Sequence, residues 1–343
     1  MFSEITRQQF LRFRSLRRAW ISLLILVFAY GLSLFSEQLA NDRPLLLRYE
    51  GGWYFPTLKF YSDETFGGAY RTEVDYLVLE QNPAFLQRGG WMLFPPIKAN
   101  PLRSYLDLPG HPPHPPSLQH WLGTDESARD VLARLLYGFR TGMSFALLLA
   151  GVGTICGVVI GGIQGYLGGF FDLATQRIIE IWSALPFLYV VILIGSIYGQ
   201  TFTVLLLVFS FFQWIGLSYY IRGEFYRLKT QTFVQAARAL GASHPRILFR
   251  HILPNALNPI VTIFPFSLIG GISSLTSLDF LGFGLPPPTP SWGEMLQQGL
   301  GNLYAPWLAL ASVLALLITL LLASFVGEGA REAFDPKSTN TVR

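Results

Sequence analysis

The residues best suited to recognising another molecule lie in a basic segment at 222–258. Thr232 and Gln235 have the spacing of a capping box, which predicts that a helix begins there. Gly241 predicts the end of that helix, because glycine readily adopts the left-handed conformation that stops a helix. Between these signals, apolar side chains recur at helical spacing and predict one apolar stripe, formed by Phe233, Ala236, Ala237 and Leu240.

A second short helix is expected after a sharp bend at Gly241. Ser243 can cap this helix, and Pro245 is tolerated in its first turn, where a missing N–H does little harm. Pro254 is expected to end it. Three basic side chains accompany the two helices and could steer and orient a partner: Arg238, Arg246 and Arg250.

The pattern of this helix pair has two interpretations. The small side chains of Ala236 and Ala237 would leave room for a partner's groove to seat the first helix deeply. Alternatively, the pair forms an amphipathic hairpin that rests on anionic lipid. The spacing of the residues is compatible with both interpretations.

Other kinds of chemistry have little support in the sequence. No Gly-x-x-x-x-Gly-Lys-Ser/Thr phosphate loop occurs, so the chain is not expected to bind ATP through one. His111 and His114 flank prolines without further ligands at metal-binding spacing, and no nucleophile motif surrounds any Ser, His or Asp. We therefore expect no catalytic, cofactor or metal site in this chain, and no enzymatic activity of its own.

The composition is that of a membrane protein. Of the 343 residues, 51% are hydrophobic and only 13% are charged, whereas a soluble domain carries roughly 25% charged residues. The net charge of +4 is modest, and the basic residues fall in short blocks beside apolar runs. This distribution predicts membrane topology and gives no indication of nucleic-acid binding.

Six segments are apolar and long enough to cross a bilayer, which requires about 20 residues. They are residues 20–39, 144–166, 178–198, 202–221, 259–278 and 306–326. The first follows five arginines and no cleavage pattern, so it is expected to be retained. Lys and Arg concentrate at 1–19, 222–251 and 327–343, which predicts that both chain ends are cytoplasmic. We therefore expect an all-α polytopic protein with six transmembrane helices.

The chain is expected to divide into four parts. Residues 1–40 form the cytoplasmic N-terminus and first transmembrane helix, and residues 41–120 form an aromatic-rich extracytoplasmic insert. Residues 121–335 form a core of five transmembrane helices with the basic loop at 222–258, and residues 336–343 form a cytoplasmic tail. Thr124 or Asp125 could cap a helix from about Glu126 that lies along the outer membrane face before the second span.

Four glycines in the second span recur every four residues: Gly153, Gly157, Gly161 and Gly165. They share one helix face and would let a neighbouring helix approach closely. Tight packing within the chain is the simpler interpretation, and a sliding or gating surface is the alternative.

Glu180, near the start of the third span, is expected to pair with Arg177, whereas Asp279 could face a solute path or cap a turn.

The basic loop also resembles a known family. Gln235-Ala-Ala, three residues, Gly241, nine residues and His251-Ile-Leu253-Pro254 resemble the "EAA" loop of binding-protein-dependent ABC importer permeases. That loop typically reads Glu-Ala-Ala, three residues, Gly, nine residues and Ile-x-Leu-Pro. Gln235 therefore replaces the family's Glu, and His251 stands where Ile often stands.

The resemblance extends over roughly residues 120–335. Its motifs look like the C-type permease of the dipeptide/oligopeptide group, and the long insert looks like the microcin C/oligopeptide branch. The motifs are Leu122-Gly-Thr-Asp125, Arg129-Asp-Val-Leu132, Gln164-Gly-Tyr-Leu-Gly-Gly169, Thr276-Ser-Leu-Asp-Phe-Leu-Gly-Phe-Gly-Leu285, Pro290-Ser-Trp-Gly-Glu294 and Ala305-Pro-Trp307.

The resemblance implies a type I ABC importer permease in a bacterial inner membrane. Its implied partners are a second permease, two ATPase subunits or one fused double ATPase, a periplasmic binding protein, a peptide substrate and the lipid bilayer. ATP and Mg²⁺ would be bound by the ATPase subunits, which would hold the loop from Thr232 to Pro254. A secondary transporter, or another membrane protein with an interfacial hairpin, is the alternative, although the spans lack the central charges expected of ion coupling.

Overall fold

The structure, a computed structural model, describes residues 4–334. The expected tail at 336–343 lies outside the described residues. Within residues 4–334, four helices are long and apolar enough to cross a membrane, or up to six if each of two bent helix pairs counts as one span. The all-α class is confirmed, with one small sheet that the sequence did not indicate.

The chain forms two compact units, each built from segments that are distant in sequence. Within the described residues, one comprises 4–28, 142–286 and 317–334, and the other comprises 29–141 and 287–316. This division differs from the expected one, because residues 121–141 and 287–316 cluster with the insert. Buried ion pairs described below join those two segments to each other, and the Tyr137 hydroxyl joins them to the residue that precedes the insert by donating to the Ala40 carbonyl at 3.0 Å.

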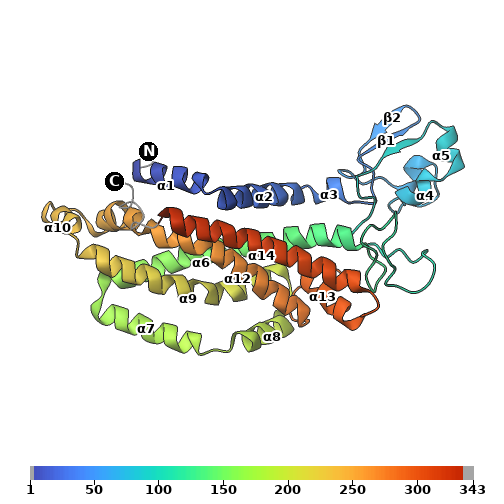
Figure 1. The fold of residues 1–343 in the computed structure, drawn as a ribbon. Helices are drawn as coiled ribbons and strands as arrows, with labels where there is room; N and C mark the ends of the chain where they lie inside the picture. The colour runs from blue at the N-terminus through green and yellow to red at the C-terminus, as the bar shows by residue number, and fades with distance from the viewer. Residues whose placement is uncertain (1–3, 335–343) are drawn as a thin grey trace. The chain divides into compact units, whose positions relative to one another are not determined.

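The smaller unit contains the insert and its sheet. Strand β1 (Leu46–Tyr49) pairs antiparallel with β2 (Gly52–Tyr54) on one side and β3 (Trp91–Leu93) on the other. Figure 1 shows α4 (Tyr76–Glu80) and α5 (Pro83–Gln87) near the strands. The unit also contains α3 (Ser36–Leu39) and η1 (Asp63–Phe66). The aromatic rings of Tyr49, Phe66 and Phe85 are buried in its core, which explains the aromatic composition of this segment.

The same unit holds the start of α6 (Val131–Leu167), α13 (Trp292–Gly301) and the start of α14 (Pro306–Phe334). The separate surface helix expected from Glu126 is wrong, because α6 is one continuous helix that begins at Val131. Its first turn is capped by Asp130, whose carboxylate accepts a hydrogen bond from the Ala133 N–H at 2.7 Å. Asp125 is instead drawn into the buried ion pairs.

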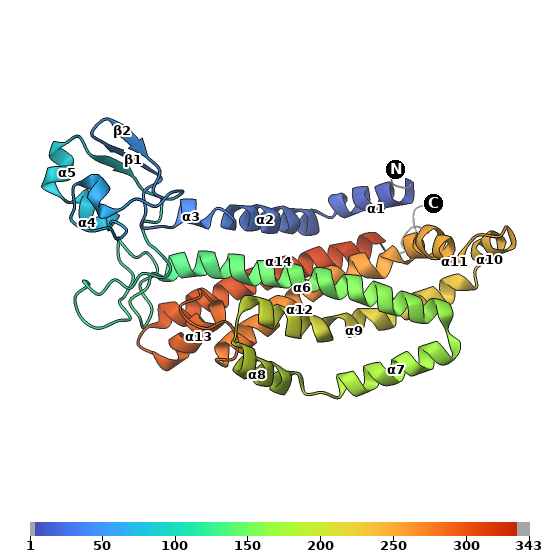
Figure 2. The same ribbon diagram turned by 180° about the vertical axis from the view of Figure 1, so that it is seen from behind.

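The larger unit consists mainly of long helices. They are α1 (Glu4–Ser15), most of α2 (Arg17–Ser33), the rest of α6, α7 (Gly169–Ser183), α8 (Phe187–Tyr198), α9 (Phe202–Lys229), α12 (Leu257–Phe280) and the end of α14. Figure 2 shows α7 and α8 following one another at an angle. The span expected at 178–198 is interrupted, since α7 and α8 are bent by 72° at a break near Pro186 and count as one span only when taken as a bent pair. Proline lacks an N–H and disfavours helical geometry in the preceding residue.

Candidate functional site

The basic loop forms a compact helical hairpin at the end of α9. Helix α9 extends to Lys229, so the hairpin occupies residues 230–256, between α9 and α12. It contains α10 (Thr232–Ala239), α11 (His244–Arg246), the π-helical turn η2 (Ile247–Ile252) and the 3₁₀ turn η3 (Leu253–Ala256). Figures 1 and 2 both place α10 beyond the end of α9.

The start of α10 differs from the predicted capping box. Gln231 occupies the N-cap position, Thr232 is the first helical residue, and no side chain caps the helix. The Gln235 side-chain amide instead donates a hydrogen bond to the Thr230 carbonyl at 3.0 Å. Gln235 therefore joins the helix to the preceding turn through a neutral hydrogen bond, which a glutamate at this position could not donate.

The end of α10 has the predicted glycine stop. Gly241 has a left-handed φ of 78°. Its N–H donates to the Arg238 carbonyl, and the Ala242 N–H donates to the Ala237 carbonyl, both at 3.0 Å. This pair of hydrogen bonds is the Schellman arrangement, which satisfies carbonyls left free at the helix end.

The second arm of the hairpin is longer and less regular than expected. Ser243 lies at the N-cap of α11 with an extended backbone, but its side chain makes no capping hydrogen bond. The expected stop at Pro254 is wrong, because Pro254 lies within η3 and the chain continues into α12. The wide turn η2 and the tighter turn η3 adjust the backbone where proline removes a donor.

The two faces of α10 have different environments. Val234 is buried in a cluster with Ile247 and Ile252 of the second arm, and Ala237 is also buried, so Ala237 does not leave space for a partner as expected. The exposed apolar side chains are Phe233, Ala236, Ala239 and Leu240. Leu240 is 88% exposed, which leaves an apolar tip beside the Gly241 turn.

The hairpin arginines lie on its surface. Arg238, Arg246 and Arg250 are all exposed, and none forms an ion pair with another residue in the part of the chain that the structure describes, 4–334. Leu253, by contrast, packs against the buried cluster between the hairpin and the helices. The hairpin therefore presents an apolar tip and three available positive charges.

An ion pair missed by the sequence reasoning holds the helices at the base of the hairpin. The Arg222 guanidinium on α9 donates two hydrogen bonds to the Asp172 carboxylate on α7, at 2.5 and 2.7 Å. The Tyr226 hydroxyl donates a third to Asp172 at 2.9 Å. Asp172 is buried, so these donors compensate the loss of water around its charge. Its position in an apolar run beside glycines was the only available signal.

Two further contacts hold the end of α6, one from the last residue of α9 and one from the hairpin. The Lys229 ammonium at the end of α9 donates to the Gly165 carbonyl at 2.8 Å, at the C-terminus of α6 where a positive charge is favourable. The Tyr166 hydroxyl lies 2.5 Å from Nδ1 of His244 at the start of α11. A displacement of the hairpin would therefore act on α6, α7 and α9 together.

The four-residue glycine row of α6 faces α9. A Cβ atom on Gly153 would lie 2.7 Å from the Gln213 side chain, and one on Gly165 would lie 2.5 Å from the Arg222 carbonyl. Gly157 and Gly161 face Leu217 and Ser218 in the same way. The structure thus places these glycines at a close approach of two helix backbones.

The two charged residues noted at the span ends are also paired. Arg177 donates to Glu180 at 2.5 Å on an exposed surface of α7. The Asp279 carboxylate accepts a hydrogen bond from the Leu285 N–H at 2.7 Å, which closes the turn after α12. Both observations favour local structural roles for these residues.

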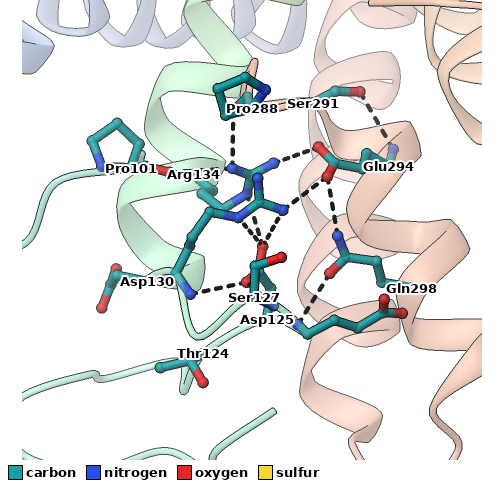
Figure 3. Close-up of polar contacts among 12 residues, drawn as sticks. Pro101, Thr124, Asp125, Ser127, Asp130, Arg134, Pro288, Ser291, Glu294 and Gln298 are labelled. Carbon is teal, nitrogen blue, oxygen red and sulfur yellow. Dashed lines mark hydrogen bonds and ion pairs between the residues drawn. The ribbon is translucent and has the colours of Figure 1, made fainter. Parts of the chain in front are cut away.

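The smaller unit contains a second group of charged residues, shown in Figure 3. The Arg134 guanidinium donates to Glu294 at 2.5 Å and lies 3.3 Å from the Asp125 carboxylate. Arg129 donates to both Asp125 and Glu294 at 2.8 Å. The Gln298 amide donates to Glu294 at 3.1 Å. We call these five residues the ionic network.

The ionic network balances its charges inside the protein. Two arginines face two carboxylates, and the Arg134 side chain has no exposed surface. Burial lowers the pKa of Arg129, but the nearby charges of Asp125 and Glu294 outweigh that effect and raise its pKa above the usual value. Arg129 is therefore positively charged at physiological pH and joins the segment before α6 to α13.

Comparison with known proteins assigns the chain to a family. Residues 157–340 match the family described as the inner membrane component of binding-protein-dependent transport systems. The chain belongs to this family. The matched region includes the hairpin, the glycines from Gly157 onward and the Asp172–Arg222 pair, but not Asp125, Arg129 or Arg134.

Full-length relatives agree with this assignment. The permease is 46% identical to the inner membrane ABC transporter permease protein YejE of Escherichia coli, over 97% of this chain and 98% of the relative. It is 41% identical to the peptidoglycan transport system permease protein YejE of Agrobacterium fabrum, over 98% and 94%. It is 35% identical to the oligopeptide transport system permease protein OppC of Haemophilus influenzae, over 64% and 70%.

These similarities confirm the resemblance to peptide-type ABC importer permeases. The permease is the membrane-spanning subunit of an ABC importer and a multi-pass protein of the inner membrane. Such permeases work with a second permease, ATPase subunits and a binding protein.

Within residues 4–334, no group of three His, Cys, Asp or Glu side chains lies close enough together to hold a metal ion.

Proposed function

We propose that this permease imports peptides and that its hairpin at 230–256 docks on an ATPase subunit in the cytoplasm. The observation that carries the docking proposal is the exposed hairpin surface, which carries Leu240 and three arginines that form no ion pair within residues 4–334. An apolar tip left in water is unfavourable and becomes favourable when a partner covers it. The arginines would orient that partner by charge complementarity.

The peptide substrate is supported by the relatives. The Haemophilus influenzae relative is named for oligopeptide transport, and the Agrobacterium fabrum relative for peptidoglycan transport. Both substrates contain peptide bonds. An oligopeptide, including a microcin C-like peptide, is therefore the proposed substrate, delivered by a periplasmic binding protein to a path formed with the second permease.

The proposed orientation places both chain ends in the cytoplasm, because the basic segments at 1–19, 222–251 and 327–343 would then lie inside. ATP and Mg²⁺ would be held by two ATPase subunits or one fused double ATPase. Closure of these subunits would move the hairpin, and the contacts of Lys229 and His244 would pass that movement to α6. In this scheme Asp172 keeps α7 and α9 together while they move.

Docking is best tested at an exposed position, because Ala237 and Gly241 both support the hairpin itself. Leu240→Asp places a charge at the exposed tip without altering a buried contact. We expect it to abolish co-purification of the ATPase subunit with the permease and to stop peptide uptake. Leu118→Asp is the matched control, because Leu118 is 96% exposed in the insert, and it should change neither property.

Retention of the ATPase subunit and of uptake by the Leu240→Asp variant would overturn the docking proposal. The alternative in which the hairpin rests on lipid predicts that Leu240→Asp leaves ATPase co-purification unchanged. The substrate is tested separately with labelled oligopeptides and free amino acids in cells with and without the permease. Uptake of amino acids but not of oligopeptides would contradict the peptide assignment and leave docking unaffected.

A further inference from the structure

The N-terminal helix α1 is held at a sharp angle to the helix that follows it. Helix α1 and helix α2 are bent by 93° at Leu16. Phe13 of α1 is buried in a cluster with Ala19, Ala330 and Ala333. The Trp20 ring also meets the rings of Phe10 and Phe13 edge-on, with centroids 6.0 and 6.4 Å apart. These contacts fix the direction of α1.

The outer surface of this bend is strongly basic. Residues 4–18 contain five arginines and one glutamate. Arg7, Arg14, Arg17 and Arg18 are exposed and form no ion pair within residues 4–334. The Arg14 guanidinium lies 5.8 Å from the centroid of the Trp20 ring, so its position is defined. The four side chains offer charge that nothing in the described chain neutralises.

Exposed apolar side chains accompany these charges. Phe10 and Leu11 are 53% and 52% exposed on α1. A helix that carries both arginines and large apolar side chains on its surface suits the boundary between headgroups and acyl chains, where each kind of side chain finds a favourable environment. A purely aqueous position would leave Phe10 and Leu11 in water.

We infer that α1 lies in the plane of the membrane and binds anionic phospholipid headgroups of the cytoplasmic leaflet. This inference rests on the proposed orientation of the N-terminus. If α2 crosses the bilayer, the 93° bend directs α1 along the membrane surface. Arg17 and Arg18 are the first residues of α2, so the end of the span itself sets the arginines at headgroup depth.

The geometry favours lipid over the ATPase subunit as the partner of α1. Only Leu16 separates α1 from α2, so α1 has no connecting segment that could carry it away from the membrane surface. The hairpin, in contrast, follows the end of the 28-residue helix α9. Each arginine near an anionic surface contributes on the order of 1 kcal/mol to membrane attraction, which predicts a preference for anionic over zwitterionic lipid.

The test uses the complete transporter and the variant Arg7→Gln with Arg14→Gln. Arg17 and Arg18 are kept because they contribute to topology. Binding of phosphatidylglycerol and of phosphatidylcholine is measured by native mass spectrometry of the purified complex. We expect the variant to bind phosphatidylglycerol about 30-fold more weakly, which corresponds to about 2 kcal/mol, and to bind phosphatidylcholine as before.

The matched control is Arg246→Gln with Arg250→Gln, which removes the same charge from the hairpin and should leave phosphatidylglycerol binding unchanged. Equal lipid binding by the α1 variant and the unaltered transporter would overturn the inference. Loss of ATPase co-purification with unchanged lipid binding would also overturn it and assign α1 to the ATPase subunit. Protease access to an N-terminal tag separates failure of the orientation from failure of lipid binding.

Discussion

Arginines occupy two contrasting environments in this permease. In the ionic network, Arg129 and Arg134 are buried and fully matched by Asp125 and Glu294. On the hairpin, Arg238, Arg246 and Arg250 are exposed and unpaired within the described residues 4–334.

The difference between these environments separates two uses of charge. A buried charge must be compensated inside the chain, because its transfer from water costs several kcal/mol. The ionic network therefore fixes the position of segments that are distant in sequence. An exposed charge is compensated by water and can exchange that water for a partner at little cost, which is the property required of a docking surface.

The largest expected effect on stability is that of Glu294→Ala. Removal of this carboxylate leaves Arg129 and Arg134 with excess buried positive charge. We expect the free energy of unfolding to fall by about 3–5 kcal/mol, measured by denaturant unfolding of the purified protein in detergent.

The control for this substitution is Glu37→Ala in the same unit. Glu37 pairs with Arg140 at 2.9 Å, but its side chain is 43% exposed. Exposed pairs contribute about 0.2–1 kcal/mol, so the loss should be within that range. If both substitutions destabilise the protein equally, the distinction between buried and exposed charges does not hold here.

The ionic network shows a limit of prediction from one sequence. Asp125, Arg129 and Glu294 were visible in the sequence as parts of family-like motifs. Their mutual contact was not predictable, because Glu294 lies 165 residues after Arg129 and neither hydropathy nor spacing reports such a pairing. The contact depends on how the segment before α6 meets α13.

The hairpin shows what local sequence can specify. Gly241 correctly predicted the stop of α10, because a glycine stop depends on the residue's own backbone preference. Thr232 and Gln235 failed as a capping box, since Gln231 took the N-cap position and Gln235 found the Thr230 carbonyl. Long spans were predicted from their apolar length, but the break near Pro186 was not, because the residues on both sides of it are mainly apolar.

The second prediction concerns Asp172, whose ion pair is intermediate in burial between the ionic network and the hairpin surface. It is buried, but the side chain of its partner Arg222 is 31% exposed. Asp172→Asn removes the charge that receives hydrogen bonds from Arg222 and Tyr226, and water can replace part of that loss. We expect the free energy of unfolding to fall by about 1.5–3 kcal/mol, less than for Glu294→Ala.

Glu180→Gln is the matched control on the same helix, because its pair with Arg177 is exposed. Its effect should stay below about 1 kcal/mol. Peptide uptake measured beside stability distinguishes the role of Asp172 in transmission from its role in folding. Uptake that falls only in proportion to the amount of folded protein would indicate that Asp172 has no part in transmission.

The smallest expected effect on stability comes from the hairpin arginines. Their replacement tests most directly whether exposed charges serve docking and buried charges serve folding. Replacement of Arg238, Arg246 and Arg250 by Gln removes three charges that have no ion-pair partner in residues 4–334. Surface substitutions of this kind usually change the free energy of unfolding by at most about 0.5 kcal/mol. Association with the ATPase subunit should nevertheless fall at least about tenfold and should weaken further as salt is added, because salt screens exposed charges.

The control replaces three exposed cations of the insert, Arg48, Lys59 and Arg71, by Gln. This variant has the same change in net charge and should bind the ATPase subunit normally. A hairpin variant that is destabilised as much as Glu294→Ala would mean that its arginines also support the fold. A hairpin variant that is stable and still binds the ATPase subunit with unchanged salt dependence would mean that exposed, unpaired charge does not identify the docking surface. Docking would then depend on the apolar tip at Leu240 alone.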